Sequence, residues 1–142
     1  MLVRDRDDFI EILLVERTPS SRPGAGDLRL HVRVAFSTFR GEYDKIWVEA
    51  AAFAAFFSEL EALETRRRGS ATLGSMSPDE FILDIHSTGA AGHIAISGQL
   101  GRLCFLGDGG WSLCLIPFNL ALPCTSLLPQ LLAEFRSWND SG

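Results

Sequence analysis

Strict alternation of apolar and polar side chains marks the segment Leu28-Arg29-Leu30-His31-Val32-Arg33-Val34-Ala35-Phe36. A β-strand sends successive side chains to opposite faces, so a period of two predicts a half-buried strand. The leucines and valines share one parity and are expected to face a core, whereas Arg29, His31 and Arg33 share the other parity. The segment therefore predicts a sheet with an apolar inner face and a basic stripe on its outer face.

Similar patterns on either side of this segment predict the other elements. Strands are expected at 9–16, 42–48, 81–85, 94–100 and 111–118, and helices at 50–67 and from Thr125 or Ser126 onward. Gly69 is expected to supply the left-handed residue that ends the first helix. The predicted order is β-β-β-α-β-β-β-β-α, which includes one strand between the helices without assigned bounds, and the short connections favour antiparallel pairing.

These elements predict an α+β fold, with a single curved antiparallel sheet of about six to seven strands and two helices packed on one face. The chain of 142 residues suits a single domain over 1–142. A mobile loop is expected at about 18–27 and a frayed C-terminus at 138–142. The face without helices is expected to carry the polar residues Glu11, Arg29, His31, Arg33, Asp84, His86, His93 and Ser97.

Composition narrows the classes of partner. The chain has 13 basic and 18 acidic residues, a net charge of −5, and such a balance disfavours binding to a phosphate backbone. The charged N-terminal segment does not resemble a signal peptide, and no apolar run approaches the roughly 20 residues of a membrane span. We therefore expect a cytoplasmic protein that binds neither nucleic acid nor membrane.

No common catalytic or nucleotide-binding signature occurs in the sequence, so we expect no enzymatic activity, no catalytic residue and no cofactor. Cys104, Cys114 and Cys124 each stand among apolar neighbours, which is typical of reduced thiols in a core. Two histidines and one carboxylate can hold a divalent metal, and His86, His93 and Asp84 offer that set at one hairpin end. A polar hairpin end facing solvent is the simpler interpretation, and no metal is expected.

The basic stripe has two interpretations. It contacts a partner, or its cations pair with acids on neighbouring strands. Tyr43, Lys45 and Trp47 share a parity and lie either outside the sheet or beneath a helix. If they lie outside, tryptophan beside arginine makes a protein-contact surface, because those residue types dominate binding hot spots. The predicted partner-binding residues are Arg29, His31, Arg33 and Trp47.

Two further hypotheses concern apolar segments. The aromatic side chains of Phe53, Phe56, Phe57 and Phe135 line either a packed core or the pocket of a small-molecule or lipid carrier. The segment 111–118 is apolar on both parities from Leu113 onward, which indicates burial on both faces or contact with a second copy in a homodimer. Pro117 in this segment indicates a bulge or an edge strand.

The layout resembles the WapI-type immunity proteins of bacterial polymorphic toxin systems and their uncharacterised relatives. The resemblance covers residues 8–136 and rests on Phe39-Arg40-Gly41, the apolar helix pattern after it, the hairpin ending at 92–96, and the closing segment 125–132. The apolar pair Pro123-Cys124 departs from the acidic approach expected before the last helix. The resemblance implies a small protein without catalytic residues that neutralises a cognate toxin domain by binding it. A net charge of −5 would speed association with a cationic toxin.

Overall fold

The computed structural model of the chain describes residues 1–89, 93–122 and 127–140. Its elements follow the chain in the order β1 (Leu2–Asp5), β2 (Asp8–Arg17), β3 (Leu28–Phe36), β4 (Phe39–Val48), α1 (Ala50–Arg66), β5 (Ser70–Gly74), β6 (Phe81–Thr88), β7 (His93–Phe105), β8 (Trp111–Leu122) and α2 (Leu127–Asp140). The predicted α+β class is confirmed. The predicted single curved sheet is wrong, because the strands form two four-stranded sheets.

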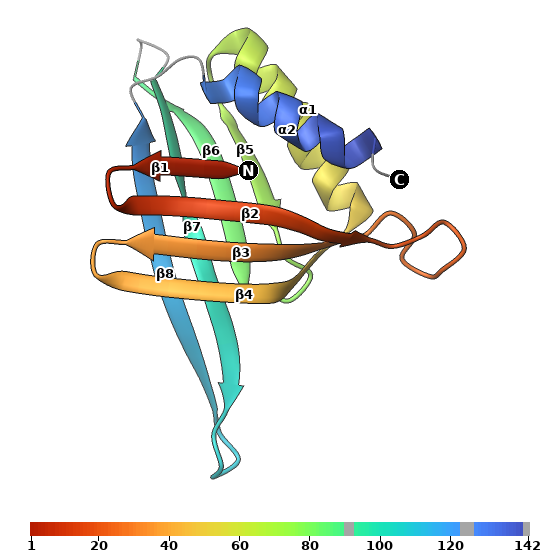
Figure 1. Ribbon diagram of the computed structural model, residues 1–142, viewed down its shortest axis with the longest axis vertical. Helices are drawn as coiled ribbons and strands as arrows, with labels where there is room; N and C mark the ends of the chain where they lie inside the picture. Colours follow the sequence, from red (N-terminus) through yellow and green to blue (C-terminus); the bar gives the residue numbers. More distant parts are fainter. Residues whose placement is uncertain (90–92, 123–126, 141–142) are drawn as a thin grey trace.

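Each sheet is an antiparallel meander of consecutive strands. Sheet A has the order β1-β2-β3-β4, and sheet B has the order β5-β6-β7-β8. The strands of the two sheets cross one another, with α1 linking the last strand of sheet A to the first strand of sheet B (Figure 1). Alternation along a strand shows which residues share a face, but it does not show which sheet the strand joins.

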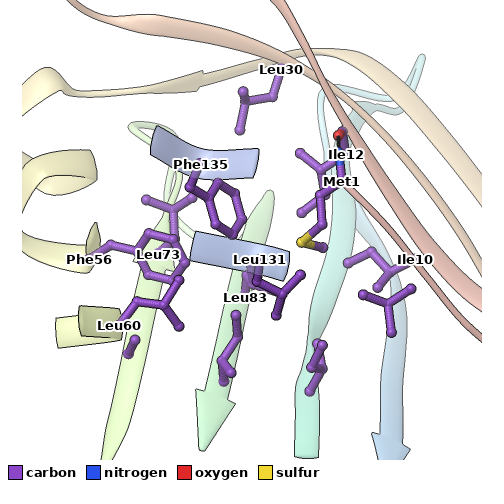
Figure 2. Close-up of a cluster of buried hydrophobic side chains, with 14 of the residues drawn as sticks. Met1, Ile10, Ile12, Leu30, Phe56, Leu60, Leu73, Leu83, Leu131 and Phe135 are labelled. Atoms are coloured by element: carbon purple, nitrogen blue, oxygen red, sulfur yellow. Dashed lines mark hydrogen bonds between the residues drawn. The ribbon is translucent and has the colours of Figure 1, made fainter. Parts of the chain in front are cut away.

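The inner faces of the two sheets enclose one core. The apolar set predicted for β3 is confirmed for its leucines and valines, because Leu28, Leu30 and Val32 are fully buried and Val34 is 1% exposed. Phe36 has the same parity but is only partly buried, whereas Ala35 of the other parity is fully buried. Side chains from both sheets and both helices point toward this interior, among them Ile12 of β2 and Leu83 of β6 (Figure 2). Crossed sheets of this kind bury one face each and leave the other face of each sheet for contact with solvent or a partner.

Helix α1 keeps its predicted bounds to within one residue and buries Phe53, Phe56, Leu60 and Leu63. The left-handed residue at its end is Arg67, whose N–H donates to the Leu63 carbonyl at 2.8 Å, and not the expected Gly69. Gly69 also has a positive φ, but it lies outside the cap.

Helix α2 packs on α1 and buries every apolar residue predicted for it, which are Leu128, Leu131, Leu132 and Phe135. The N-cap predicted at Thr125 or Ser126 lies outside the described residues. Residues 138–140, expected at a frayed end, belong to α2, and Trp138 is 5% exposed. The two helices lie together along β5, at one end of the crossed sheets (Figure 1).

The hairpin of β7 and β8 extends beyond the rest of sheet B. Strand β6 pairs with β7 only as far as Leu100, whereas β7 and β8 remain paired out to Phe105 and Trp111. We call the far part of this hairpin, residues 101–116, the arm. Its root contacts sheet A through Arg102, and its tip projects away from the helices and sheet A (Figure 1). Pro117 lies on β8, the edge strand of sheet B, with no register shift at that point.

Candidate protein-binding surface

The basic stripe of β3 lies on the outer face of sheet A, as its parity predicts. Arg29 lies 3.2 Å from Glu16, His31 lies 2.7 Å from Glu42, and Arg33 lies 2.8 Å from Glu11. We call this the charged face, and it consists of Glu11, Glu16, Arg29, His31, Arg33 and Glu42. Acid–base pairs on neighbouring strands stabilise a sheet by a few tenths of a kcal/mol each, about as much as other favourable cross-strand pairs.

Strand register explains why these charges meet. Arg33 is the Cα partner of Glu11 on β2 and of Glu42 on β4, so one guanidinium lies between two carboxylates. The second of these contacts is longer, at 3.9 Å. Exposed ion pairs contribute about 0–1 kcal/mol each, so their main effect here is to hold long side chains in defined positions. Because glutamates already pair with these cations, the charged face has little excess charge to offer a nucleic acid.

A β-bulge separates the aromatic residues of β4 that share a parity in the sequence. Val32 is the partner of Tyr43, but Leu30 is the partner of Ile46, so one residue of β4 has no partner on β3. Past this bulge the side chains exchange faces. Tyr43 therefore packs against the core, whereas Trp47 lies opposite Arg29 on the outer face and is partly exposed.

All four predicted partner-binding residues thus lie on one side of sheet A, and a hollow of about 420 Å³ lies beside two of them, Arg29 and His31. Its lining includes Arg29 and His31 from the charged face, Lys45 from the bulge, and Arg102 from the arm. The Arg102 guanidinium lies 5.1 Å from the centre of the Tyr43 ring, a cation–π contact that joins the arm to sheet A. The hollow is open to solvent and carries both signs of charge.

A second hollow, of about 360 Å³, lies at the other end of the charged face. Phe9 lines it, with Arg33, Arg40 and Glu42. Two guanidiniums approach the Phe9 ring, that of Arg4 at 4.8 Å and that of Arg33 at 5.8 Å from the ring centre. Phe9 was not among the predicted site residues, although an aromatic residue with the parity of Glu11 was a usable signal.

The residues considered for a metal lie elsewhere, on the outer face of sheet B. Their expected place on the same face as Glu11 and Arg33 is wrong, because β6 and β7 belong to the other sheet. Asp84 Oδ2 lies 2.7 Å from His86 Nδ1, and the Thr72 hydroxyl donates to Asp84 Oδ1 at 2.9 Å. His93 is exposed at the start of β7. Within residues 1–89, 93–122 and 127–140, no three histidine, cysteine or acidic side chains form a group that would suit a metal.

Two of the three thiols lie on the arm. Cys104 is half-buried and Cys114 is exposed, so the expectation of core thiols is wrong for both; each is a free thiol. At Cys104 and Cys114 the hairpin of β7 and β8 has already extended past the rest of sheet B. The apolar residues beside these two cysteines therefore do not form a core. Cys124 lies outside the described residues.

Aromatic rings fill the space between the two helices. Phe135 of α2 contacts Phe56 at 5.1 Å and Trp138 at 4.8 Å between ring centres, both edge to face. Phe53 stacks on Trp138 at 5.9 Å. Such edge-to-face packing is typical of a close-packed core, and it gives no support to the pocket of a carrier at this place.

No protein-family model, curated protein or solved structure matches this chain. Among the described residues, neither helix has the length and apolar character needed to cross a membrane. The fold and its surfaces define the chain as an α+β protein with crossed antiparallel sheets and an ion-paired outer strand face.

Proposed function

We propose that this chain is a non-enzymatic protein-binding module, an immunity-type protein that neutralises a cognate toxin domain by covering its active site or substrate groove. One observation carries the proposal: Arg29, His31, Arg33 and Trp47 share one outer face of sheet A, with a hollow beside the first two. Tryptophan and arginine are the residue types that contribute most to binding at protein interfaces.

Preorganisation supports this assignment of the face. Cross-strand ion pairs restrain the arginine and histidine side chains before a partner arrives, and β3 lies between two neighbouring strands, a rigid support. Less side-chain freedom is then lost on binding, which favours affinity. The mixed charge of the face suits a protein partner with complementary acids and bases, and the net charge of −5 would attract a cationic toxin.

The first experiment identifies the partner. The tagged chain is expressed in its source cells, and the proteins that co-purify are identified by mass spectrometry. A partner with a toxin-like domain is then produced in a test strain, with and without this chain. The proposal expects growth arrest by the toxin domain alone and growth when this chain is present. A toxin that still arrests growth beside an equal amount of this chain contradicts neutralisation.

Variants then test the face. Arg29→Glu, Arg33→Glu and Trp47→Ala should each weaken binding to the purified toxin domain by at least about tenfold, as expected for central contacts. Arg68→Glu, in the turn after α1, is the matched control and should leave affinity unchanged, because it lies outside the charged face. Affinity is measured by titration calorimetry. If the three variants all bind as tightly as the parent chain, the binding face lies elsewhere.

A further inference from the structure

The arm carries a large exposed apolar patch on the outer face of sheet B. We call it the arm patch; its members are 40–63% exposed and are Leu103, Phe105, Leu106, Trp111, Leu113 and Leu115. Strand register places Leu103 opposite Leu113 and Phe105 opposite Trp111, so these four side chains share one side of the hairpin. The rings of Phe105 and Trp111 contact edge to face, with centres 5.1 Å apart. Large apolar side chains offer roughly 200 Å² each, so the arm patch exposes on the order of 600 Å², as much as the largest patch on a typical monomer.

The arm patch is free of charge. From Gln99 to Phe105 and from Trp111 to Pro117, no strand position that faces the same way carries a charged side chain. Arg102 faces the opposite side, toward Tyr43. A lipid surface is a poor occupant, because anionic headgroups would meet Asp108 in the turn and a chain of net charge −5. The arm patch therefore suits an apolar protein surface.

Side-chain size changes steadily along the arm patch. The large rings of Phe105 and Trp111 lie at the tip, the leucine pair lies in the middle, and Gly101 with Leu115 lies at the root. A Cβ on Gly101 would overlap the Leu115 side chain, so that side chain already covers the glycine. When two such patches meet antiparallel about a two-fold axis, the rings of each tip lie over Gly101 and Leu115 at the root of the other, where only one of the two positions carries a side chain. The patch is thus complementary to itself in volume, as an isologous interface requires.

We propose that the arm patch is the interface of a homodimer, in which two arms pack face to face about a two-fold axis near the Leu103–Leu113 pair. The area of the patch approaches the roughly 800 Å² that each partner buries in a standard interface, which is consistent with a dimer of micromolar affinity. This interface is separate from the charged face of sheet A, so a dimer leaves that face available.

Face-to-face packing is favoured over pairing of strand edges. Strand β8 is the open edge of sheet B, and continuous pairing with a second β8 would need donors along its whole length. Pro117 has no N–H and interrupts that ladder. The second copy is thus expected to cover the side chains of the arm and not to extend the sheet.

Sedimentation equilibrium of the purified chain alone, from about 1 µM to about 100 µM, tests the proposal. The parent chain should approach twice 15.6 kDa as its concentration rises. Leu113→Glu places a charge at the centre of the interface and should weaken self-association by roughly 100-fold, leaving a monomer up to about 10 µM and only partial dimer at about 100 µM. Met76→Glu is the matched control, because Met76 and Leu113 are both 40% exposed, and it should dimerise like the parent.

Far-UV circular dichroism checks that each variant is folded, and Trp111→Ser is a second disruptive variant if Leu113→Glu fails to fold. A parent chain that stays monomeric to 100 µM overturns the proposal, and flotation with phosphatidylcholine vesicles then shows whether the arm patch contacts lipid instead. A Leu113→Glu dimer as stable as the parent dimer also overturns it. Because no toxin is present, these outcomes leave the proposed function untouched.

Discussion

At the scale of the residue, one glycine allows the strands of sheet B to approach closely. Gly98 of β7 has a φ of +156°, and a Cβ added there would overlap the Ile82 carbonyl oxygen on β6. The same Cβ would lie 2.8 Å from Cζ of Phe118, whose ring covers the glycine from the neighbouring strand. Backbone atoms cannot move aside as a flexible side chain can, so this position accepts only glycine.

Gly98→Ala is therefore expected to lower the free energy of unfolding by about 2–4 kcal/mol. Gly74→Ala is the control, since a Cβ on Gly74 meets nothing within 4 Å, and it should change stability by less than about 0.5 kcal/mol. Urea unfolding followed by circular dichroism, at one fixed protein concentration, measures both variants. Equal midpoints for the two alanine variants would show that β6 and β7 do not approach as described.

At the scale of the element, the loop 18–27 supplies the cap of a helix that lacks one of its own. Glu49 stands at the N-cap of α1 but makes no side-chain cap bond. Asp27 replaces it, because its Oδ1 accepts a hydrogen bond from the Ala50 N–H at 2.9 Å. The loop holds Asp27 in place through the Thr18 N–H, which donates to the Asp27 carbonyl at 2.8 Å. A cap residue far from its helix in sequence leaves no local signal, so the sequence analysis missed it.

Replacing this cap tests the link between loop and helix. Asp27→Ala removes the acceptor for one of the N–H groups at the start of α1 and should cost about 1 kcal/mol of unfolding free energy. Glu49→Ala is the control, and we expect a change below about 0.5 kcal/mol because no cap bond is lost. Thermal unfolding of both variants gives the comparison. An Asp27→Ala chain as stable as Glu49→Ala would contradict the capping role.

Elements with a long periodic pattern could be predicted from the sequence, and short or interrupted ones could not. The alternation of β3 and the three-and-four spacing of α2 identify most of their buried residues, but they miss Ala35 on β3 and Trp138 on α2. Strand β1 was missed, and no bounds were predicted for β5, because each has few residues in which alternation can show. In α1 the pattern selected Phe57, but Phe56 is fully buried and Phe57 only partly, since neighbouring phenylalanines satisfy the period almost equally well.

The candidate site was predictable only in part. Parity placed Arg29, His31 and Arg33 on one outer face, and the acids that pair with them follow from antiparallel register. Tyr43 and Trp47 lie on opposite faces of sheet A because of a β-bulge in β4. No distinctive residue in β4 marks this bulge in the sequence. The hollow beside Arg29 and His31 depends on how β4 lies against Arg102 of the arm, and that is a property of the assembled fold.

At the scale of the whole molecule, a single sheet was predicted but two are present, and this difference has a single physical cause. Helix α1 connects β4 to β5, and a strand that follows a helix can either rejoin the old sheet or begin a new one. In this chain β5 begins a new sheet across the first, so each sheet buries one face and the helices close one end (Figure 1). The residues expected on one polar face are consequently divided between two.

The same architecture leaves the arm outside the core except at its root, where Ile116 packs partly buried against it. Between Leu100 and Phe118, no described apolar side chain is fully buried, so this part of the hairpin adds little to the stability of the monomer. Arg102 and Cys114 are Cα partners. Replacing residues 103–113 with Asn-Gly would therefore close the hairpin at an existing pair with a two-residue turn.

We expect the shortened chain to unfold cooperatively, with a free energy of unfolding within about 1 kcal/mol of the parent, because no buried side chain is lost. Leu100→Ala is the comparison within the core, because the Leu100 side chain is 4% exposed. That truncation should lower the free energy of unfolding by about 2–5 kcal/mol. Urea unfolding at about 1 µM keeps any self-association of the parent from adding to its apparent stability. A shortened chain less stable than Leu100→Ala would mean that the arm belongs to the folding unit, whereas the structure assigns the core to the crossed sheets and the two helices.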